Sequence, residues 1–484
     1  MNKILKICVP LLLFSVCGNL PAEEFVHWYD AYVILKVPRY KLRRFPIPYK
    51  RVRCKRKCIL RVERRHWKEV KDRLSYVEVV KEPAFKDIFP EYWKTRKLSL
   101  GYKSYRRVVR WLIWFRRKHP RHVRLLRVGK SWKGRTIWAL RLFRGRYKSK
   151  PNIYINAAHH GNEVLSIEYA LDVAQFLVQN TETYERSLRK KEKRNISEKA
   201  KLAYDLLEKY NVYVVPVINS DGLERFWTVS YTEGRKNARK QRRYQRKKFG
   251  VDLNRNYPFM WNSGIEKASS DDPNSPYYRG KKPASEPETK AIIRFAKKYS
   301  FVFSVSFHTY ATKILIPYTI NGLKNPVPDY PTYIAERIVK AGISYREEKE
   351  FKAVKQLYPV DGTDQDWLFH TFGTLAYIYE GSHQNPPWRV AKKSIHGMRL
   401  MMIETWKVLL DYPVAIFRTK PSTVWKPSKL LLQEKESWRT NPKGIGYFFP
   451  ALLYEKYFEV YFPEEKKTVK LFCFHSYCKE HINK

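Results

Sequence analysis

Residues Ile153-Tyr154-Ile155-Asn156-Ala157-Ala158-His159-His160-Gly161-Asn162-Glu163 form an apolar run that passes directly into a polar His-x-x-Glu segment. Apolar residues then recur at helical spacing from Val164 to Leu177. This order predicts a buried strand, a turn and a core-facing helix, which together are typical of an α/β fold. The turn offers an imidazole and a carboxylate, His160 and Glu163, and both groups suit zinc.

Three further apolar runs predict buried strands that end in polar residues, at 212–217, 301–307 and 375–379. His308 ends the second run and Glu380 ends the third, while Asn219-Ser220-Asp221-Gly222 is expected to be a turn. Strands that alternate with helices predict an α/β fold with a mixed, largely parallel central sheet flanked by helices. Functional groups of such sheets lie at the carboxyl ends of the strands, where these polar residues fall.

Helices are expected from Tyr105 to before Pro120 and from Ile395 to Leu410, and a hairpin is expected over 128–137. The charged segment 181–201 is predicted to be a surface excursion. Around this core we expect four regions, which are an export signal at 1–22, an N-terminal accessory α/β segment at 23–97, a catalytic domain at 98–411 and a C-terminal β-rich module at 412–484. The sequence does not decide whether 23–97 is removed as a propeptide.

The N-terminus has the pattern of an export signal, with Lys3 and Lys6 before an apolar run and a cleavage site expected after Ala22. Cys17 allows a lipoprotein alternative, although Val16 is bulky for such a site. No later segment approaches the roughly 20 apolar residues of a membrane helix. We therefore expect a secreted or periplasmic protein without a transmembrane segment after signal removal.

The formal net charge is +50 and is spread over nearly the whole chain. Such a charge favours electrostatic association with anionic cell-wall or membrane surfaces. No zinc-finger, basic-zipper or RNA-binding signature accompanies it, so we expect no specific nucleic-acid partner. Beyond the signal lie Cys54, Cys58, Cys473 and Cys478, and export makes disulfides plausible, with their connectivity open.

The polar strand ends together suggest a metal hydrolase. His308 is the natural third metal ligand beside His160 and Glu163, and one zinc ion per chain would leave a position open for water. A buried carboxylate at Glu380 would be a general base, although a salt bridge with an arginine is the alternative. Asn254 with Arg235, Arg239 and Arg255 could hold a substrate carboxylate and stabilise an oxyanion.

These residues resemble the zinc carboxypeptidases of the carboxypeptidase A type. The resemblance runs from about Tyr102 to Leu410. Its motifs, in chain order, are His160-x-x-Glu163, the segments 217–222, 234–239, 252–258 and 307–310 (the last ending at Tyr310), Tyr358 with 362–367, and Glu380. The resemblance implies a zinc peptidase that removes C-terminal residues.

Residue by residue, the resemblance implies that His160, Glu163 and His308 bind zinc and that Glu380 is the general base. It implies that Asn254 and Arg255 grip the terminal carboxylate, and that Tyr358 closes over the substrate. Tyr310 lies in a matching motif and is expected to contact substrate. The oxyanion arginine stays open, since one motif frame favours Arg235 and another favours Arg239.

The pocket for the terminal side chain departs from the basic-specific members of this family. Gln365 is expected at its floor and Thr319 at a second position, and neither is acidic. We therefore do not predict a preference for Lys or Arg. We expect a secreted zinc metallocarboxypeptidase that acts on peptides, with a muropeptide peptidase of the same fold as the alternative. An inactive binding relative is a third possibility, which the complete ligand set argues against.

Overall fold

The structure is a computed structural model of the 484-residue chain. It describes residues 32–54, 56–63, 70–81, 101–145, 150–190, 197–229, 234–239, 250–320, 322–323, 325, 329–342, 350–386 and 388–411, and the strand residues 415–418, 424–427, 438–439, 445–448, 457–462, 467–474 and 477–480. The expected signal at 1–22 and the basic segment 240–249 lie outside these ranges.

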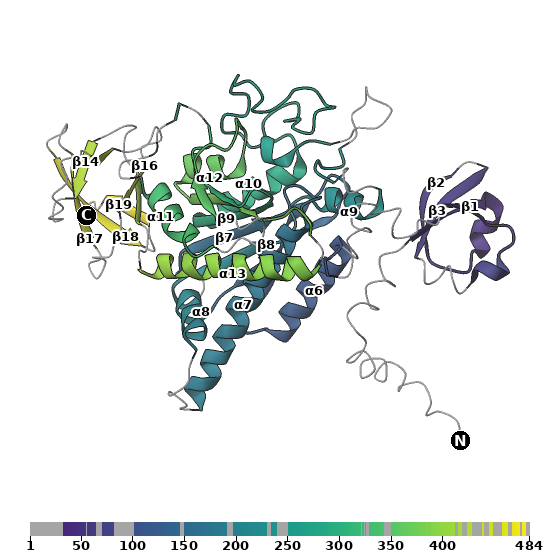
Figure 1. Cartoon of the computed structure of the whole chain (residues 1–484), viewed down its shortest axis with the longest axis horizontal. Helices are drawn as coiled ribbons and strands as arrows, with labels where there is room; N and C mark the ends of the chain where they lie inside the picture. The colour runs from purple at the N-terminus through teal and green to yellow at the C-terminus, as the bar shows by residue number, and fades with distance from the viewer. Residues whose placement is uncertain are drawn as a thin grey trace. The chain divides into compact units, whose positions relative to one another are not determined.

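An eight-stranded sheet with the order β11-β10-β12-β9-β7-β8-β6-β5 carries the strands expected from the sequence. Figure 1 labels its strands β7, β8 and β9, which lie among the helices. The four central strands β12, β9, β7 and β8 run parallel to one another, whereas β6 and β10 join them antiparallel. The predicted mixed, largely parallel sheet is therefore confirmed. Its strands are β5 (Val123–Lys130), β6 (Thr136–Leu142), β7 (Asn152–Ala157), β8 (Asn211–Val215), β9 (Phe301–Thr309), β10 (Lys313–Leu315), β11 (Lys352–Val354) and β12 (Leu375–Gly381).

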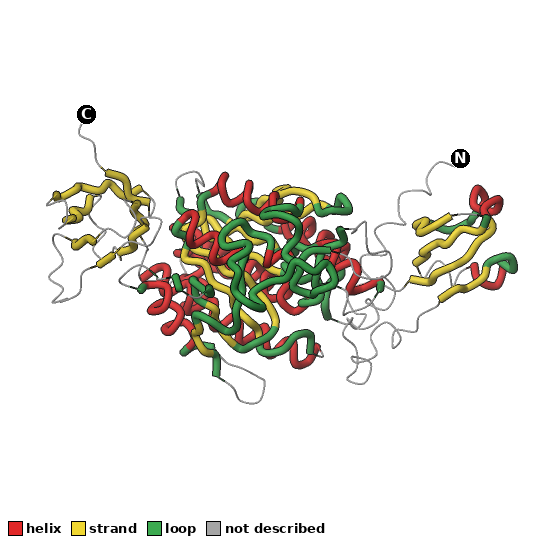
Figure 2. Tube along the Cα trace, turned by 90° about the horizontal axis from the view of Figure 1, so that it is seen from above, coloured by secondary structure: helices red, strands yellow, loops and turns green. Residues whose placement is uncertain are grey.

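Helices flank this sheet (Figure 2). They are α6 (Tyr105–Lys118), α7 (Val164–Arg189), α8 (Glu198–Lys209), α9 (Ser220–Thr228), α10 (Pro287–Tyr299), α11 (Tyr330–Val339), α12 (Asp364–Phe372) and α13 (Trp388–Asp411). The central strands β8, β9 and β12 are buried along their whole length, and β7 is buried beyond its first residue, which explains why they read as continuous apolar runs. Parallel strands covered by helices bring their carboxyl ends, and the residues that follow them, to one edge.

The two faces of the sheet have different helical partners. Tyr154 of β7 shares a buried core with Phe295 of α10 and Trp367 of α12. On the opposite face, the ring of Tyr169 in α7 contacts Phe307 of β9, and its hydroxyl lies 2.6 Å from Ser394 Oγ of α13. Side chains alternate between the faces of a strand, so the residue after Phe307 points toward the α10 and α12 side.

Two local predictions were wrong. Segment 181–201 was predicted as a surface excursion without a helix assignment, but α7 continues to Arg189 and α8 begins at Glu198, while 191–196 lie outside the described residues. The segment contains no Pro or Gly to stop a helix, and its charged residues are good helix formers on an exposed face. Asn219-Ser220-Asp221-Gly222 is not a free turn, because α9 begins at Ser220 and Asn219 Oδ1 accepts the Gly222 N–H at 2.8 Å.

The N-terminal segment forms a four-stranded antiparallel sheet with the order β2-β3-β1-β4. Its strands are β1 (Tyr32–Pro38), β2 (Tyr49–Cys54), β3 (Lys57–Glu63) and β4 (Glu78–Lys81). Val33, Leu35 and Leu60 are fully buried in a core of its own. A disulfide joins Cys54 to Cys58 across the β2–β3 hairpin. The sequence also predicts a helix at 64–74, of which residues 64–69 lie outside the described ranges and 71–73 form the short 3₁₀ helix η3 (Lys71–Arg73).

The C-terminal region is β-rich, as expected. Seven strands form a sheet with the order β15-β14-β17-β18-β19-β13-β16. They are β13 (Ala415–Arg418), β14 (Val424–Pro427), β15 (Trp438–Arg439), β16 (Ile445–Phe448), β17 (Tyr457–Phe462), β18 (Lys467–Phe474) and β19 (Tyr477–Glu480). The boundaries predicted at residues 97 and 411 stay predictions.

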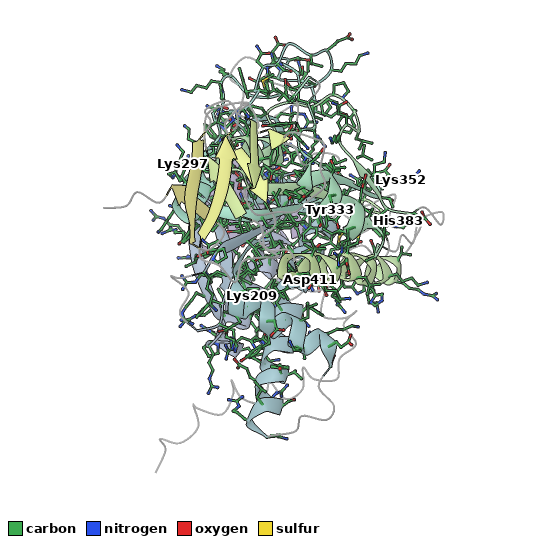
Figure 3. The ribbon with its side chains drawn as sticks, turned by 90° about the vertical axis from the view of Figure 1, so that its left-hand side faces the viewer. Lys209, Lys297, Tyr333, Lys352, His383 and Asp411 are labelled. Carbon is green, nitrogen blue, oxygen red and sulfur yellow. A yellow bond between two sulfur atoms is a disulfide. The ribbon has the colours of Figure 1, made fainter. Side chains whose placement is uncertain are left out.

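Positive charge is distributed over several elements of the surface. The labelled side chains of Lys209, Lys297 and Lys352 come from α8, α10 and β11, and they lie well apart from one another (Figure 3). Within the described ranges, no helix combines the length and the apolar character that crossing a bilayer requires.

Candidate metal centre

Four polar side chains meet at one edge of the sheet because of where their strands end. His160 and Glu163 lie in the turn between β7 and α7, and His308 lies near the end of β9. Glu380 is the register partner of His308 on the parallel strand β12. Gly161 permits the tight turn, since a Cβ there would sit 2.2 Å from the backbone nitrogen of Leu223.

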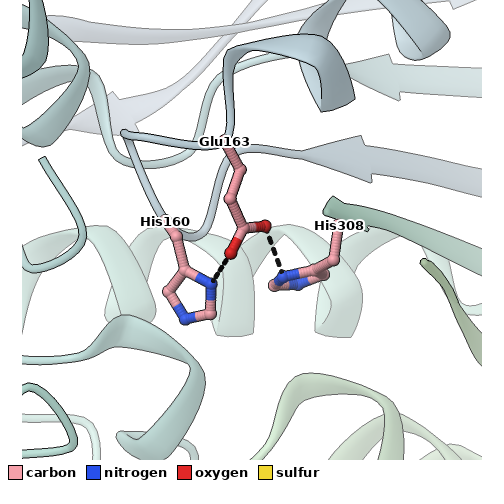
Figure 4. Close-up of side chains that lie close together, drawn as sticks. All are labelled: His160, Glu163 and His308. Atoms are coloured by element: carbon pink, nitrogen blue, oxygen red, sulfur yellow. Dashed lines mark hydrogen bonds and ion pairs between the residues drawn. The ribbon is translucent and has the colours of Figure 1, made fainter. Parts of the chain in front are cut away.

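The three residues expected to bind metal converge in the structure (Figure 4). His160 Nδ1 lies 2.6 Å from Glu163 Oε1, and His308 Nδ1 lies 3.0 Å from Glu163 Oε2. One ligand atom from each residue falls within 4.8 Å of the others, and all three side chains are buried. Two imidazoles and a carboxylate form the donor set of many catalytic zinc sites, so the residues present fit this ion.

The histidines also set the charge of the carboxylate between them. Burial opposes ionisation of Glu163, but the neighbouring His160 and His308 lower its pKa well below the ordinary range. The Thr309 N–H donates a hydrogen bond of 3.0 Å to Glu163 Oε2 and further favours the anion. A metal ligand must be deprotonated, and Glu163 is held in that state.

Asp252 is a functional residue that sequence reasoning included in a motif but gave no role. Its Oδ1 lies 3.1 Å from His160 Nε2, and its Oδ2 accepts a 2.7 Å hydrogen bond from Arg235 Nη2. Burial opposes the charge of Asp252, but Arg235 and His160 hold its pKa well below the usual value. A carboxylate on the second nitrogen of a ligand histidine orients the ring for metal binding.

Glu380 has an environment opposite to that of Glu163. Burial raises the pKa of Glu380 to about 7, His308 and Arg235 oppose this rise, and Glu163 adds to it. A carboxyl group with a pKa near neutrality can accept and return a proton at the pH of most enzyme reactions. The environment of Glu380 therefore suits the general-base role expected for it.

The two candidate oxyanion arginines lie in different surroundings. Arg235 Nη1 lies 3.4 Å from His160 Nδ1, beside the metal-binding residues. Arg239 Nη1 instead donates a 2.6 Å hydrogen bond to Glu286, and its guanidinium lies over the ring of Trp132 at 4.7 Å. The structure therefore brings Arg235, and not Arg239, to the metal centre.

Arg255 and Asn254 form a buried pair in the 3₁₀ turn η7 (Leu253–Arg255). Arg255 Nη1 donates to Asn254 O at 2.8 Å, and Arg255 Nε donates to Ala268 O at 3.0 Å. Tyr358 is about half exposed; burial raises its pKa, while Arg255, through its charge and a side-chain hydrogen bond, lowers it. Tyr358 therefore lies within reach of the Arg255 guanidinium.

The expected pocket residues lie on α12 and the segment after β10. Gln365 is fully buried, and its Nε2 lies 3.4 Å from Thr319 Oγ1. The Thr319 hydroxyl donates a 2.6 Å hydrogen bond to Asp366, so its oxygen is left to accept from the Gln365 amide. Tyr310, two residues beyond His308, is 48% exposed and is not part of this buried group.

The comparisons with known proteins agree with this geometry. The model of a family described as zinc carboxypeptidase matches residues 108–398. Mast cell carboxypeptidase A of Homo sapiens is 28% identical over 284 residues, which cover 56% of this chain and 62% of the relative. Zinc carboxypeptidase A 1 of Anopheles gambiae is 27% identical over 298 residues, which cover 59% and 61% of the two chains.

A crystal structure of thrombin activatable fibrinolysis inhibitor has the same fold. It aligns with a TM-score of 0.55 at 19% identity and covers 79% of this chain and 99% of the other. The chain spans about three fifths of the length of the two relatives. The described site residues fall within the matched region.

Proposed function

The chain belongs to the zinc carboxypeptidase family, and we propose that it is a zinc metallocarboxypeptidase that removes the C-terminal residue of peptides. The observation that carries this proposal is the convergence of His160, Glu163 and His308 beside Glu380 at one sheet edge. An inactive binding relative would need no such complete set. The chemistry of the donor set and the family both support zinc as the metal.

In this proposal His160, Glu163 and His308 hold the metal. Zinc, when bound, would polarise the scissile carbonyl and lower the pKa of the attacking water. The Glu380 carboxylate accepts a proton from that water and then delivers a proton to the nitrogen of the leaving residue. Its pKa of about 7 suits both directions of transfer.

Arginines at two places would handle the negative charges of the substrate. Arg235 donates hydrogen bonds to the carbonyl oxygen as negative charge develops there, and Asp252 fixes its guanidinium for this task. Arg255 and Asn254 hold the terminal carboxylate, and the exposed Tyr358 closes over it with a hydroxyl donor. Recognition of a free C-terminus makes the reaction exopeptidic.

The pocket for the terminal side chain would be uncharged at its floor. Gln365 and Thr319 contact each other there, and Val360 and Leu315 are buried apolar residues with which the pocket wall would be built. We therefore propose neutral terminal residues as substrates, in preference to Lys or Arg. Tyr310, two residues beyond His308 and partly exposed, would also contact substrate.

The peptidase proposal and its muropeptide alternative differ in the substrate that the enzyme cleaves. We favour peptides, and muropeptides are the alternative because export and the +50 charge would bring the protein to anionic cell-wall material. The test offers the zinc-loaded protein a peptide library and a muropeptide mixture, and identifies the products by mass. Loss of single C-terminal residues from peptides is expected; cleavage of muropeptides alone would favour the alternative, and no cleavage of either would contradict both.

A further inference from the structure

The two ligand histidines differ at the ring nitrogen that faces away from Glu163. His160 Nε2 has a carboxylate partner, Asp252, at 3.1 Å. His308 Nε2 is buried and has no hydrogen-bond partner among the described residues. A metal-binding histidine almost always donates its other N–H to a carboxylate, a carbonyl or a water, so a partner for His308 is expected.

Asp364, the first residue of α12, lies on the same face of the sheet as His308. Its Oδ2 accepts a 3.3 Å hydrogen bond from Asn156 Nδ2, and Asn156 is the register partner of Ser306. Ser306 and His308 are two residues apart on β9, so their side chains point to the same face at a spacing of roughly 7 Å. The Asp364 carboxylate therefore lies on the same face of the sheet as the His308 ring, next to the neighbouring Ser306 position.

A third histidine, His159, lies near both His308 and Asp364. The ring of His159 stacks on that of His308, with centroids 5.6 Å apart and planes inclined by 10°. His159 Nε2 lies 3.8 Å from Asp364 Oδ2 and 2.9 Å from the Tyr257 hydroxyl. His159 therefore contacts the His308 ring on one side and approaches the Asp364 carboxylate on the other.

The other oxygen of this carboxylate is available for such a contact. Asp364 Oδ1 is buried and has no hydrogen-bond partner among the described residues. An unpaired buried acceptor and an unpaired buried donor are each costly, and a water that bridges the two would remove both costs. The Asp364 backbone is fixed, because its N–H donates to Asn254 Oδ1 at 3.0 Å.

We propose that Asp364 is the positioning carboxylate of His308 and accepts its Nε2–H through one bridging water. The contact would orient the ring so that Nδ1 faces the metal, as Asp252 does for His160. This inference rests on the proposed function only through the zinc site. A residue at the start of α12 could also stabilise the helix dipole, but that role predicts no change in metal affinity.

The test compares zinc affinity in matched variants, by competition with a chromophoric chelator and without substrate. Asp364→Asn should bind zinc about 10–100-fold more weakly than the wild type. Its cobalt-substituted form should show shifted visible absorption bands. The zinc affinity of Asp252→Asn shows how much affinity is lost when a positioning carboxylate is removed.

The matched control is Asp366→Asn, two residues further along α12. Asp366 is equally buried, but both of its oxygens already accept hydrogen bonds from Thr319. We expect Asp366→Asn to cost stability and to leave zinc affinity unchanged. If Asp364→Asn does not fold, Asp364→Ser keeps a residue suited to a helix start and carries the same expectation.

The outcomes separate this inference from the proposed function. Zinc affinity of Asp364→Asn equal to that of the wild type, or equal losses in Asp364→Asn and Asp366→Asn, would overturn the positioning role. A wild type that binds zinc but cleaves no peptide would contradict the peptidase proposal alone. Weaker zinc binding confined to Asp364→Asn, with cleavage of peptides by the wild type, would support both.

Discussion

Glu163 and Glu380 are two buried carboxylates at the same sheet edge with opposite proton affinities. His160 and His308 lower the pKa of Glu163, whereas burial raises the pKa of Glu380 to about 7. The first is suited to a metal ligand and the second to a general base. Neighbouring groups that push two pKa values apart are a recurring way to divide acid and base tasks within one site.

The first prediction concerns Glu380. Glu380→Gln keeps the shape of the side chain but cannot accept a proton, so turnover should fall by about 10²–10⁴-fold. Zinc content should stay at one ion per chain, as measured by elemental analysis, whereas His308→Ala should lose the metal. Retained turnover in Glu380→Gln would contradict its role as base.

The second prediction concerns the pocket floor. Gln365→Asp should raise kcat/KM for peptides that end in Lys relative to those that end in Leu, because a buried carboxylate would pair with the ammonium group. Gln365→Asn is the control, since it shortens the side chain without adding charge. Comparison of the two kcat/KM ratios tests the idea; an unchanged ratio in Gln365→Asp would place Gln365 outside the pocket.

At the scale of elements, the segment Arg235–Arg239 is held by buried carboxylates. Asn237 Nδ2 donates to Glu286 Oε2 at 2.8 Å and to Glu288 Oε2 at 3.1 Å. Asn237 Oδ1 in turn accepts the Val251 N–H, next to Asp252. These hydrogen bonds of Asn237 fix which arginine faces the metal centre. The spacing of residues in the sequence could not decide this.

The third prediction is that Glu288, which accepts a hydrogen bond from Asn237, makes the stability of the fold depend on pH. Burial raises the pKa of Glu288 to about 7, above the usual 4.5. Its contribution to stability is therefore complete below about pH 4.5 and is lost as the pH rises through 7, by on the order of 3 kcal/mol. In Glu288→Gln the free energy of unfolding should not show this decrease as the pH rises. Denaturant titrations from pH 4.5 to 8 measure the difference, and parallel curves for the two proteins would contradict it.

The cysteine hairpins give the fourth prediction. Cys54 and Cys58 are bridged between β2 and β3, and Cys473 faces Cys478 in the register of β18 and β19. We expect both pairs to be oxidised in the protein that begins at residue 23. Thiol counting under denaturing, non-reducing conditions should find no free thiol; two or more free thiols would refute the second bridge or both.

The sequence predicted the central sheet because its strands are long apolar runs with polar ends. It also placed His160, Glu163, His308 and Glu380 together, since parallel strands share one carboxyl edge. Asp364 escaped notice because its contact with Asn156 joins residues 208 positions apart. The helical ends of segment 181–201, in α7 and α8, do not follow from apolar periodicity because charged residues dominate this segment.

At the scale of the whole molecule, charge and chemistry are separate features. The +50 charge is spread over many elements, while the site depends on a few buried residues at one sheet edge. Export and attraction to anionic surfaces stay proposals, because the segment expected to be the signal lies outside the described residues. They concern where the protein acts, whereas the site concerns which bond it cleaves.

The most direct measurement compares cleavage of one peptide with a free and with an amidated C-terminus, with products identified by mass. Arg255 should grip the free carboxylate through a charge-assisted pair, worth roughly 1.5–3 kcal/mol. The account predicts that the zinc-loaded wild type removes the last residue of the free peptide and leaves the amide nearly intact. In Arg255→Ala the two peptides should differ far less. Equal cleavage of both peptides by the wild type would contradict the carboxypeptidase account and favour an endopeptidase on the same scaffold.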